Sequence, residues 1–174
     1  ERMEPMNQAR KIYCRAFQTV FKIALPVLPY RKPKLAGSVK ALPEIIEKNK
    51  CSRILIVTDP GIQKLNLTAR LERALKAAGM FYCVYGKTSA NPTTDNVYEA
   101  LKRYQENGCD AIIGFGGVSS MDCAKAVGAR AVKPRQSLAK MKGILKVHKR
   151  LPLLIAVPTT AGTGSETTLA AVIT

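Results

Sequence analysis

The sequence predicts an α/β fold built on a parallel β-sheet, and three observations support this prediction. Short β-branched apolar runs alternate with amphipathic helical patterns at a spacing of about 25–30 residues, which is typical of βαβ units. The apolar runs are continuous, as expected for strands that are buried on both faces. With 174 residues, of which 47% are hydrophobic, the chain is long enough for one domain with its own core.

The strands and helices follow one another in order from residue 53. The apolar runs predict strands over residues 53–59, 81–86, 110–115 and 151–160. Helical periodicity predicts helices between them, over residues 67–79, 94–108 and 119–131, and a basic connector with a helical turn over 133–143. Gly79 and Gly108 are expected to stop the first two helices.

The apolar stripes of two of these helices predict which of their side chains are buried. The helix over 67–79 should place its apolar stripe on the core, namely Leu67, Leu71, Ala74, Leu75 and Ala78. The helix over 94–108 should do the same with Val97, Ala100, Leu101 and Tyr104.

Residues 9–25 form a separate amphipathic pattern that Pro26 ends. Its apolar stripe is expected to pack on its own domain or on a subunit partner, and docking on a membrane surface is the alternative. We therefore expect an N-terminal helix and linker over 1–30, followed by an α/β domain over 31–174. The most apolar stretch, residues 16–30, contains a lysine and two prolines and is shorter than the roughly 18 apolar residues that span a bilayer, so no transmembrane segment is expected.

Charge and cysteine content restrict the class of protein further. The net charge of +16 and the pI of about 9.9 favour a phosphate-rich partner, or basic faces that acidic parts of a larger protein balance. No aromatic residues interleave with the basic patch at 133–150, so stacking on single strands is poorly supported. Specific nucleic-acid binding is not expected, and binding of nucleic acid through the basic patches is kept as a minor alternative. The five cysteines form no CxxC motif, which favours reduced thiols that pack as small hydrophobes in a cytoplasmic protein.

The stretch GFGGVSSMDCAK, residues 114–125, follows the third predicted strand. Ser119 occupies the expected N-cap of the next helix, and Asp122 lies three residues later, as in a capping box. Gly116 and Gly117 permit a tight turn that leaves backbone N–H groups free, and a helix N-terminus of that kind binds anions. A glycine-rich turn that binds nothing is the alternative, because GxGxx without its last glycine is a weak motif.

A second turn of similar composition follows the fourth strand, in AGTGSE at 161–166. Two such turns at one sheet edge favour a single ligand with a pyrophosphate and a ribose. Asp59 ends the first strand and adds a carboxylate that can bind a ribose diol and repel a 2′-phosphate, which favours NAD over NADP. The alternative role for Asp59 is a helix or turn cap.

GGVSSMDCAK together with PTTAGTGSE resembles the paired signature of the iron-containing (group III) alcohol dehydrogenases, and SANPTTDNV and VTDPG resemble two further motifs of that family in the same order. The resemblance covers residues 31–174. It implies a Rossmann-like, dehydroquinate synthase-like nucleotide-binding domain. Val118 departs from the family's pattern, which has a third glycine at that position.

The resemblance also implies a cofactor site for NAD. Gly116, Gly117 and Ser119 would contact the cofactor phosphates, and Asp122 would lie near the nicotinamide. Asp59 would hold the adenosine ribose. The remaining residues implied to bind the nucleotide or line its groove are Asn91, Thr159, Thr160 and Thr163.

The family's activity, as the resemblance implies it, is hydride transfer between an alcohol or aldehyde and the nicotinamide, assisted by a divalent metal, most often iron. Its metal ligands belong to a helical C-terminal domain that we expect to be absent from these 174 residues. The single histidine, His148, lies in a basic context and is not expected to bind metal. We assign no catalytic residue, and we expect these 174 residues to be inactive by themselves. The resemblance also implies a homo-oligomer, namely a dimer.

Two other functions remain open from the sequence. The chain can belong to a glycerol dehydrogenase or dehydroquinate synthase-like enzyme, since these share the implied fold. It can also be a nucleotide-binding or assembly module without catalysis of its own.

Overall fold

The computed structural model describes residues 33–143, 146–147, 149–168 and 171–174, together with residues 8, 15, 16 and 19. The helix predicted over 9–25, apart from residues 15, 16 and 19, and His148 therefore lie outside the described residues. The chain divides into two units, Glu1–Leu35 and Ala36–Thr174, and the sheet and its helices belong to the second. The predicted boundary after residue 30 stays a prediction.

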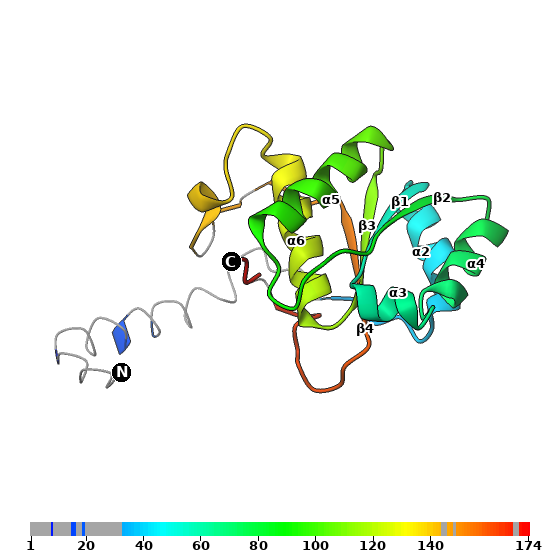
Figure 1. Ribbon diagram of the computed structural model, residues 1–174, viewed down its shortest axis with the longest axis horizontal. Coiled ribbons are helices and arrows are strands. Elements are labelled where there is room, and N and C mark those ends of the chain that lie inside the picture. Colours follow the sequence, from blue (N-terminus) through cyan, green and yellow to red (C-terminus); the bar gives the residue numbers. More distant parts are fainter. Residues whose placement is uncertain are drawn as a thin grey trace. The chain divides into compact units, whose positions relative to one another are not determined.

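The second unit contains the predicted parallel sheet (Figure 1). Its strands are β1 (Arg53–Val57), β2 (Phe81–Tyr85), β3 (Ala111–Gly116) and β4 (Leu153–Pro158), in the spatial order β2-β1-β3-β4. All three pairings are parallel. The predicted strands are confirmed, although the first ends earlier than expected because Asp59 begins a short helix.

Helices cover both faces of the sheet, as the continuous apolar runs predicted (Figure 1). The helices on one face are α2 (Leu42–Lys48), α3 (Pro60–Lys64) and α4 (Ala69–Ala77), and those on the other are α5 (Thr94–Glu106) and α6 (Val118–Val132). Alternate residues of β1 pack into the two hydrophobic cores on opposite faces of the sheet. Ile54 and Ile56 pack with the first group of helices, and Leu55 and Val57 pack with the second.

The predicted helical faces are confirmed with two exceptions, at the two ends of the first stripe. Ala78, which was predicted to face the core, is exposed because α4 ends at Ala77. Leu71 and Leu75 of α4 are fully buried, and Val97, Ala100 and Leu101 of α5 line the opposite core. Leu67, which was predicted to face the core, is 46% exposed. The prediction was wrong because α4 begins at Ala69, so Leu67 lies in the turn before the helix and does not follow its periodicity.

Short elements were missed by the sequence analysis. These are α2, α3 and the 3₁₀ helix η1 (Val39–Ala41), whereas η2 (Ala139–Met141) is the helical turn expected in the basic connector. Pro43 and Pro60 each stand in the first turn of a missed helix, where a proline is tolerated because its absent N–H has no intrahelical acceptor. Both helices have seven residues or fewer, which is too short for a clear periodicity.

Candidate cofactor site at the carboxyl edge of the sheet

The strand order places two of the predicted turns on either side of a topological switch point. From β1 the chain moves outward to β2, and it then returns to the other side of β1 to form β3. Connections after β1 and β3 therefore leave toward opposite faces and open a crevice between them, which is where open α/β sheets bind ligands. The glycine-rich turn lies at the switch point even though it follows the third strand in the chain.

Gly116, the last residue of β3, has a conformation and surroundings that exclude a side chain. Its φ is +143°, a region that residues with a Cβ rarely adopt. A Cβ at this position would lie 2.7 Å from Ser120 Oγ and 3.0 Å from Asp59 Oδ2. The chain therefore comes close to both polar groups here, and only glycine permits that approach.

The capping box predicted for Ser119 and Asp122 is wrong. Helix α6 begins at Val118 with Gly117 as N-cap, and no side chain caps it. Ser119 lies inside the first turn, where its hydroxyl donates a hydrogen bond to the carbonyl of Ala90. The prediction failed because β3 continues to Gly116 and the turn needs only Gly117, so the helix begins two residues earlier than an N-cap at Ser119 requires.

The uncapped first turn of α6 has the properties of an anion site. The first N–H groups of a helix have no intrahelical acceptor, and the helix dipole adds partial positive charge at the same end. Val118, the residue that departs from the family pattern, is the first residue of the helix and does not have a positive φ. Its side chain is 41% exposed. The valine therefore neither strains the turn nor removes a backbone N–H group.

Asp59 connects the two sides of the switch point. One carboxylate oxygen accepts the backbone N–H of Ile62 at 3.0 Å and so caps α3. The other accepts a hydrogen bond from the Ser120 hydroxyl of α6 at 3.3 Å. The alternative that Asp59 is a helix cap is thus confirmed, while its predicted contact with a ribose stays a prediction. Ser120, 1% exposed, was missed, and its only signal was its place beside Ser119.

Asp122 is buried inside α6, at 4% exposure, and its carboxylate is held by groups of the protein. It accepts from Lys125 Nζ at 3.1 Å, from Ser165 Oγ at 3.3 Å and from the backbone N–H of Val172 at 2.9 Å. Lys125 in turn donates to the carbonyl of Ser165 at 2.8 Å. The pair thus attaches the second glycine-rich turn to α6. The predicted place of Asp122 near the nicotinamide stays a prediction.

The structure brings the two glycine-rich turns together. The backbone N–H of Thr159 donates to the carbonyl of Gly116 at 3.0 Å, directly after the last pairing of β3 with β4. Thr160 Oγ1 lies 3.9 Å from the position of a Cβ on Gly117. Thr159, Thr160 and Thr163 are exposed.

The loop that carries Asn91 is attached to the same edge by hydrogen bonds of the residues beside Asn91. Its carbonyl accepts a hydrogen bond from Ser89 Oγ at 2.8 Å, and Ala90 beside it accepts from Ser119. The loop is held further by Asn96 of α5, which forms a capping box with Thr93 and accepts from Ser89. Asn96 was missed, although the sequence TTDN contains the threonine and the asparagine at capping-box spacing.

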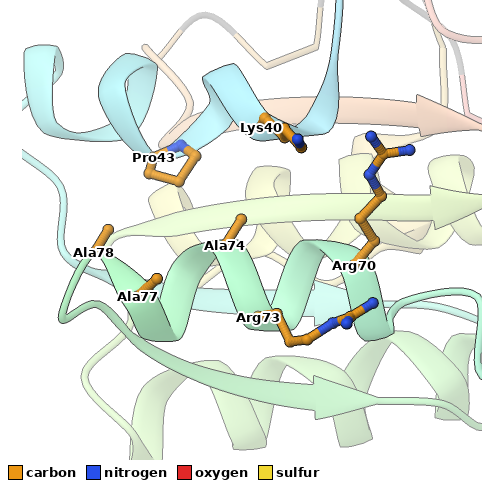
Figure 2. A pocket seen from close by; sticks show the side chains of 7 residues that line it. All are labelled: Lys40, Pro43, Arg70, Arg73, Ala74, Ala77 and Ala78. Carbon is orange, nitrogen blue, oxygen red and sulfur yellow. The ribbon is translucent and has the colours of Figure 1, made fainter.

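A groove of about 820 Å³ lies elsewhere on the described part of the chain, between η1, α2 and α4 (Figure 2). Lys40, Arg70 and Arg73 supply its positive charges, and none of the residues that line it is acidic. None of the predicted cofactor residues lines it either. The groove is therefore basic and is separate from the turn at α6.

Neither a metal site nor a membrane-spanning helix is found among the described residues. No group of three or more histidine, cysteine, aspartate or glutamate side chains is arranged there to hold a metal ion. Among the same residues, no helix is both long enough and apolar enough to cross a lipid bilayer.

The fold and its switch-point turns define an open, doubly wound α/β domain of the Rossmann-like class. More specifically, the chain belongs to the iron-containing alcohol dehydrogenase family, whose model matches residues 35–174. The resemblance read from the four motifs is thereby confirmed.

Curated and solved relatives agree with this assignment. The choline dehydrogenase of Bacillus subtilis is 38% identical over 140 residues, which are 79% of this chain and 35% of that protein. The NAD-dependent methanol dehydrogenase of Bacillus methanolicus is 33% identical over 79% of this chain and 36% of its own length. The solved alcohol dehydrogenase from Oenococcus oeni is 36% identical, with a TM-score of 0.73 over 78% of this chain and 36% of that one.

A solved structure with bound cofactor is among the similar proteins. The sulfoacetaldehyde reductase from Bifidobacterium kashiwanohense, in complex with NAD⁺, is 29% identical, with a TM-score of 0.68 over 83% of this chain and 39% of that one. The chain thus spans about a third of the length of the curated relatives it matches.

Proposed function

We propose that this chain forms the NAD-binding part of a metal-dependent alcohol dehydrogenase, which transfers hydride between an alcohol or aldehyde and the nicotinamide. The observation that carries the proposal is the uncapped N-terminus of α6 beside Gly116, at the switch point between β1 and β3. Membership of the family supports it, as does the NAD⁺ complex of one similar structure.

The residues at this edge fit a dinucleotide. The N–H groups of the first turn of α6 would bind the diphosphate, with Gly116, Gly117 and Ser119 next to it. A Cβ on Gly116 would be crowded by Ser120 and Asp59, so only the backbone of this residue is available to the proposed diphosphate. Once bound, NAD supplies the carbon that accepts or gives the hydride. The chain's own residues would bind and orient the cofactor.

The other proposed contacts surround this turn. Asp59 would hold the adenosine ribose through the oxygen that faces Ser120, and its negative charge favours NAD over NADP. Asn91, Thr159, Thr160 and Thr163 would line the groove. Asp122 would lie near the nicotinamide, and through Ser165 and Val172 it would also hold the second turn in place.

The metal is a separate matter. The described residues do not provide a set of ligands for it. We propose that the divalent metal, iron by family, binds to a part of the protein outside these residues. A homo-oligomer, a dimer, and a cytoplasmic location are likewise proposals, supported by the family and by the cysteine content.

A charge placed at Val118 tests the diphosphate site without disturbing the fold. Val118→Glu introduces a carboxylate at the first residue of α6, where the helix dipole favours negative charge, so the helix should remain stable. The same carboxylate would compete with the diphosphate for the N–H groups of the first turn. The control is Val118→Gln, which has the same shape and no charge.

Isothermal calorimetry with NAD⁺ measures the effect. The glutamate variant should bind at least about tenfold more weakly than the glutamine variant, a difference of about 1.4 kcal/mol. Their melting temperatures, followed by circular dichroism, should be similar. Equal affinity of the two variants for NAD⁺ would show that the diphosphate does not bind at α6.

The alternative of a binding module without catalysis needs a different measurement. A dehydrogenase assay on these residues with added Fe²⁺ or Zn²⁺ should give no turnover of an alcohol, since the proposed metal ligands lie elsewhere. The same assay on a longer form of the protein should give turnover if the enzyme proposal holds, and NAD⁺ binding without turnover in the longer form would favour the binding module.

A further inference from the structure

Two cysteines that the cofactor site does not use lie side by side in the core. Cys83 belongs to β2, which is an edge strand of the sheet, and Cys109 lies two residues before the start of β3. Their sulfur atoms are 3.7 Å apart. A disulfide bond is about 2.0 Å long, so the two sulfurs need to approach each other by less than about 2 Å to form one. Both residues pack in the core that α5 and α6 cover.

The two thiols differ in exposure. Cys83 is partly exposed, whereas Cys109 is buried, at 8% exposure. A small oxidant from solution therefore reaches Cys83 first, and Cys109 is held behind it.

Two arginines fix positive charge beside Cys83. Arg53 donates through Nε to the carbonyl of Asn107 at 2.8 Å and lies over the ring of Phe81, at 4.1 Å from its centroid. Arg103 of α5 donates to the carbonyl of Val84, the residue next to Cys83. Because both guanidinium groups are held by the backbone, the positive charge near the thiol is part of the fold.

This arrangement favours the thiolate at Cys83. The hydrogen bond from Cys109 lowers the pKa of Cys83 most, burial opposes that effect, and the charges of Arg103 and Arg53 lower the pKa further. The same hydrogen bond and burial raise the pKa of Cys109. The other described cysteines differ: burial and Asp110 raise the pKa of Cys51, and burial raises that of Cys123 to about 11. Of these thiols, Cys83 is the one suited to react as a nucleophile.

We propose that Cys83 and Cys109 form a site of reversible oxidation by peroxides, in which Cys83 reacts with the peroxide and Cys109 closes a disulfide bond. The Cys83 thiolate attacks one oxygen of hydrogen peroxide, the O–O bond breaks, and a sulfenic acid forms with release of hydroxide, which takes a proton to become water. The Cys109 sulfur then attacks the Cys83 sulfur, the S–O bond breaks, and the Cys109 proton leaves with the hydroxyl as a second water. Two thiols are oxidised and one peroxide is reduced to two waters.

The disulfide would enclose the whole of α5 in a covalent loop between the edge strand and the start of β3. It would thus restrain the element whose N-terminus holds the loop that carries Asn91. A dithiol reductant would reverse the reaction by thiol–disulfide exchange. The proposal does not depend on the proposed function, because it uses none of the cofactor residues.

Peptide mapping by mass spectrometry tests the proposal on the reduced chain after exposure to one equivalent of hydrogen peroxide. The expected product is a cross-link between the peptides that contain Cys83 and Cys109, which dithiothreitol removes. Oxidation should also raise the melting temperature by about 5 °C or more, since the bond closes a loop in the unfolded chain. This measurement needs no variant, so it does not depend on whether a variant folds.

Three variants separate the two roles. Cys109→Ser should leave a sulfenic acid at Cys83 that dimedone traps, and Cys83→Ser should yield neither the cross-link nor a dimedone adduct at Cys109. Cys51→Ser, a change at another partly exposed cysteine, should cross-link as the unchanged chain does. The proposal is overturned if Cys83 stays reduced while Cys51 is oxidised, or if Cys83 passes to sulfinic acid without a cross-link to Cys109.

Discussion

The ion pair of Asp122 and Lys125 is expected to determine whether the second glycine-rich turn keeps its place. Its side chains are 6% and 12% exposed, and the aspartate also accepts from Ser165 and Val172. Asp122→Ala removes the carboxylate that accepts hydrogen bonds from Lys125, Ser165 and Val172. The charge of the largely buried Lys125 then loses its negative counterpart. Breaking a buried pair from one side costs about 3–5 kcal/mol. We expect that loss in the free energy of unfolding.

Urea unfolding followed by circular dichroism measures this loss. With a urea dependence of about 2 kcal/mol per molar, the midpoint should fall by about 1.5–2.5 M. Lys125→Met should also lower it, and the double variant should lose less than the sum of the two, because interacting residues are not additive.

An exposed ion pair of similar chemistry provides the control. Glu44 and Lys48 lie 2.6 Å apart with side chains 68% and 71% exposed. Glu44→Ala should leave the urea midpoint close to that of the unchanged chain, since solvent screens such pairs. Equal effects at Glu44 and Asp122, or strict additivity of the changes at Asp122 and Lys125, would refute the reasoning that burial makes the second pair structural.

Two further predictions concern the cofactor and pH. Asp59→Asn should keep the cap on α3, because the amide oxygen accepts the same N–H of Ile62, and it should remove the charge that faces the ribose. Calorimetry should then show NADP⁺ binding gained relative to NAD⁺, and an unchanged ratio would exclude Asp59 as the group that discriminates. Burial is the main cause that raises the pKa of Tyr85 and of Tyr104 to about 12. Unfolded tyrosine ionises near pH 10, so the folded chain retains protons that the unfolded chain has lost, and stability should fall as the pH rises from about 10 to 12. Tyrosinate absorbance should show these two groups ionising last, and ionisation of all tyrosines near pH 10 would contradict the prediction.

Much of the fold could be predicted because its signals are local. Continuous apolar runs located every strand of the sheet, and stripes such as Val97, Ala100 and Leu101 located the helical faces. Helix boundaries were less accurate, since Leu67 looks periodic with α4 yet precedes it. The short helices α2 and α3 could not be found from periodicity because each has too few turns to repeat a pattern.

The sequence predicted where the candidate cofactor site lies on the sheet, but only part of how its residues contact one another. Parallel strands bring their carboxyl ends to one edge, so the turns after β1, β3 and β4 had to meet there. The partners of Asp122 could not be predicted, because Ser165 and Val172 are more than forty positions away in the chain and their contact depends on how the second turn folds back. The cap of α6 was mistaken because either Gly117 or Ser119 can take that position in the sequence.

Backbone amide chemical shifts, measured by NMR during titration with NAD⁺, would test most directly whether the cofactor binds at the switch point. The largest changes should occur at residues 116–120, with further changes at Asp59 and at 159–163. Changes that are absent from these residues and concentrated at Lys40, Arg70 and Arg73, in the groove of Figure 2, would contradict the account and place the bound anion at the other basic site.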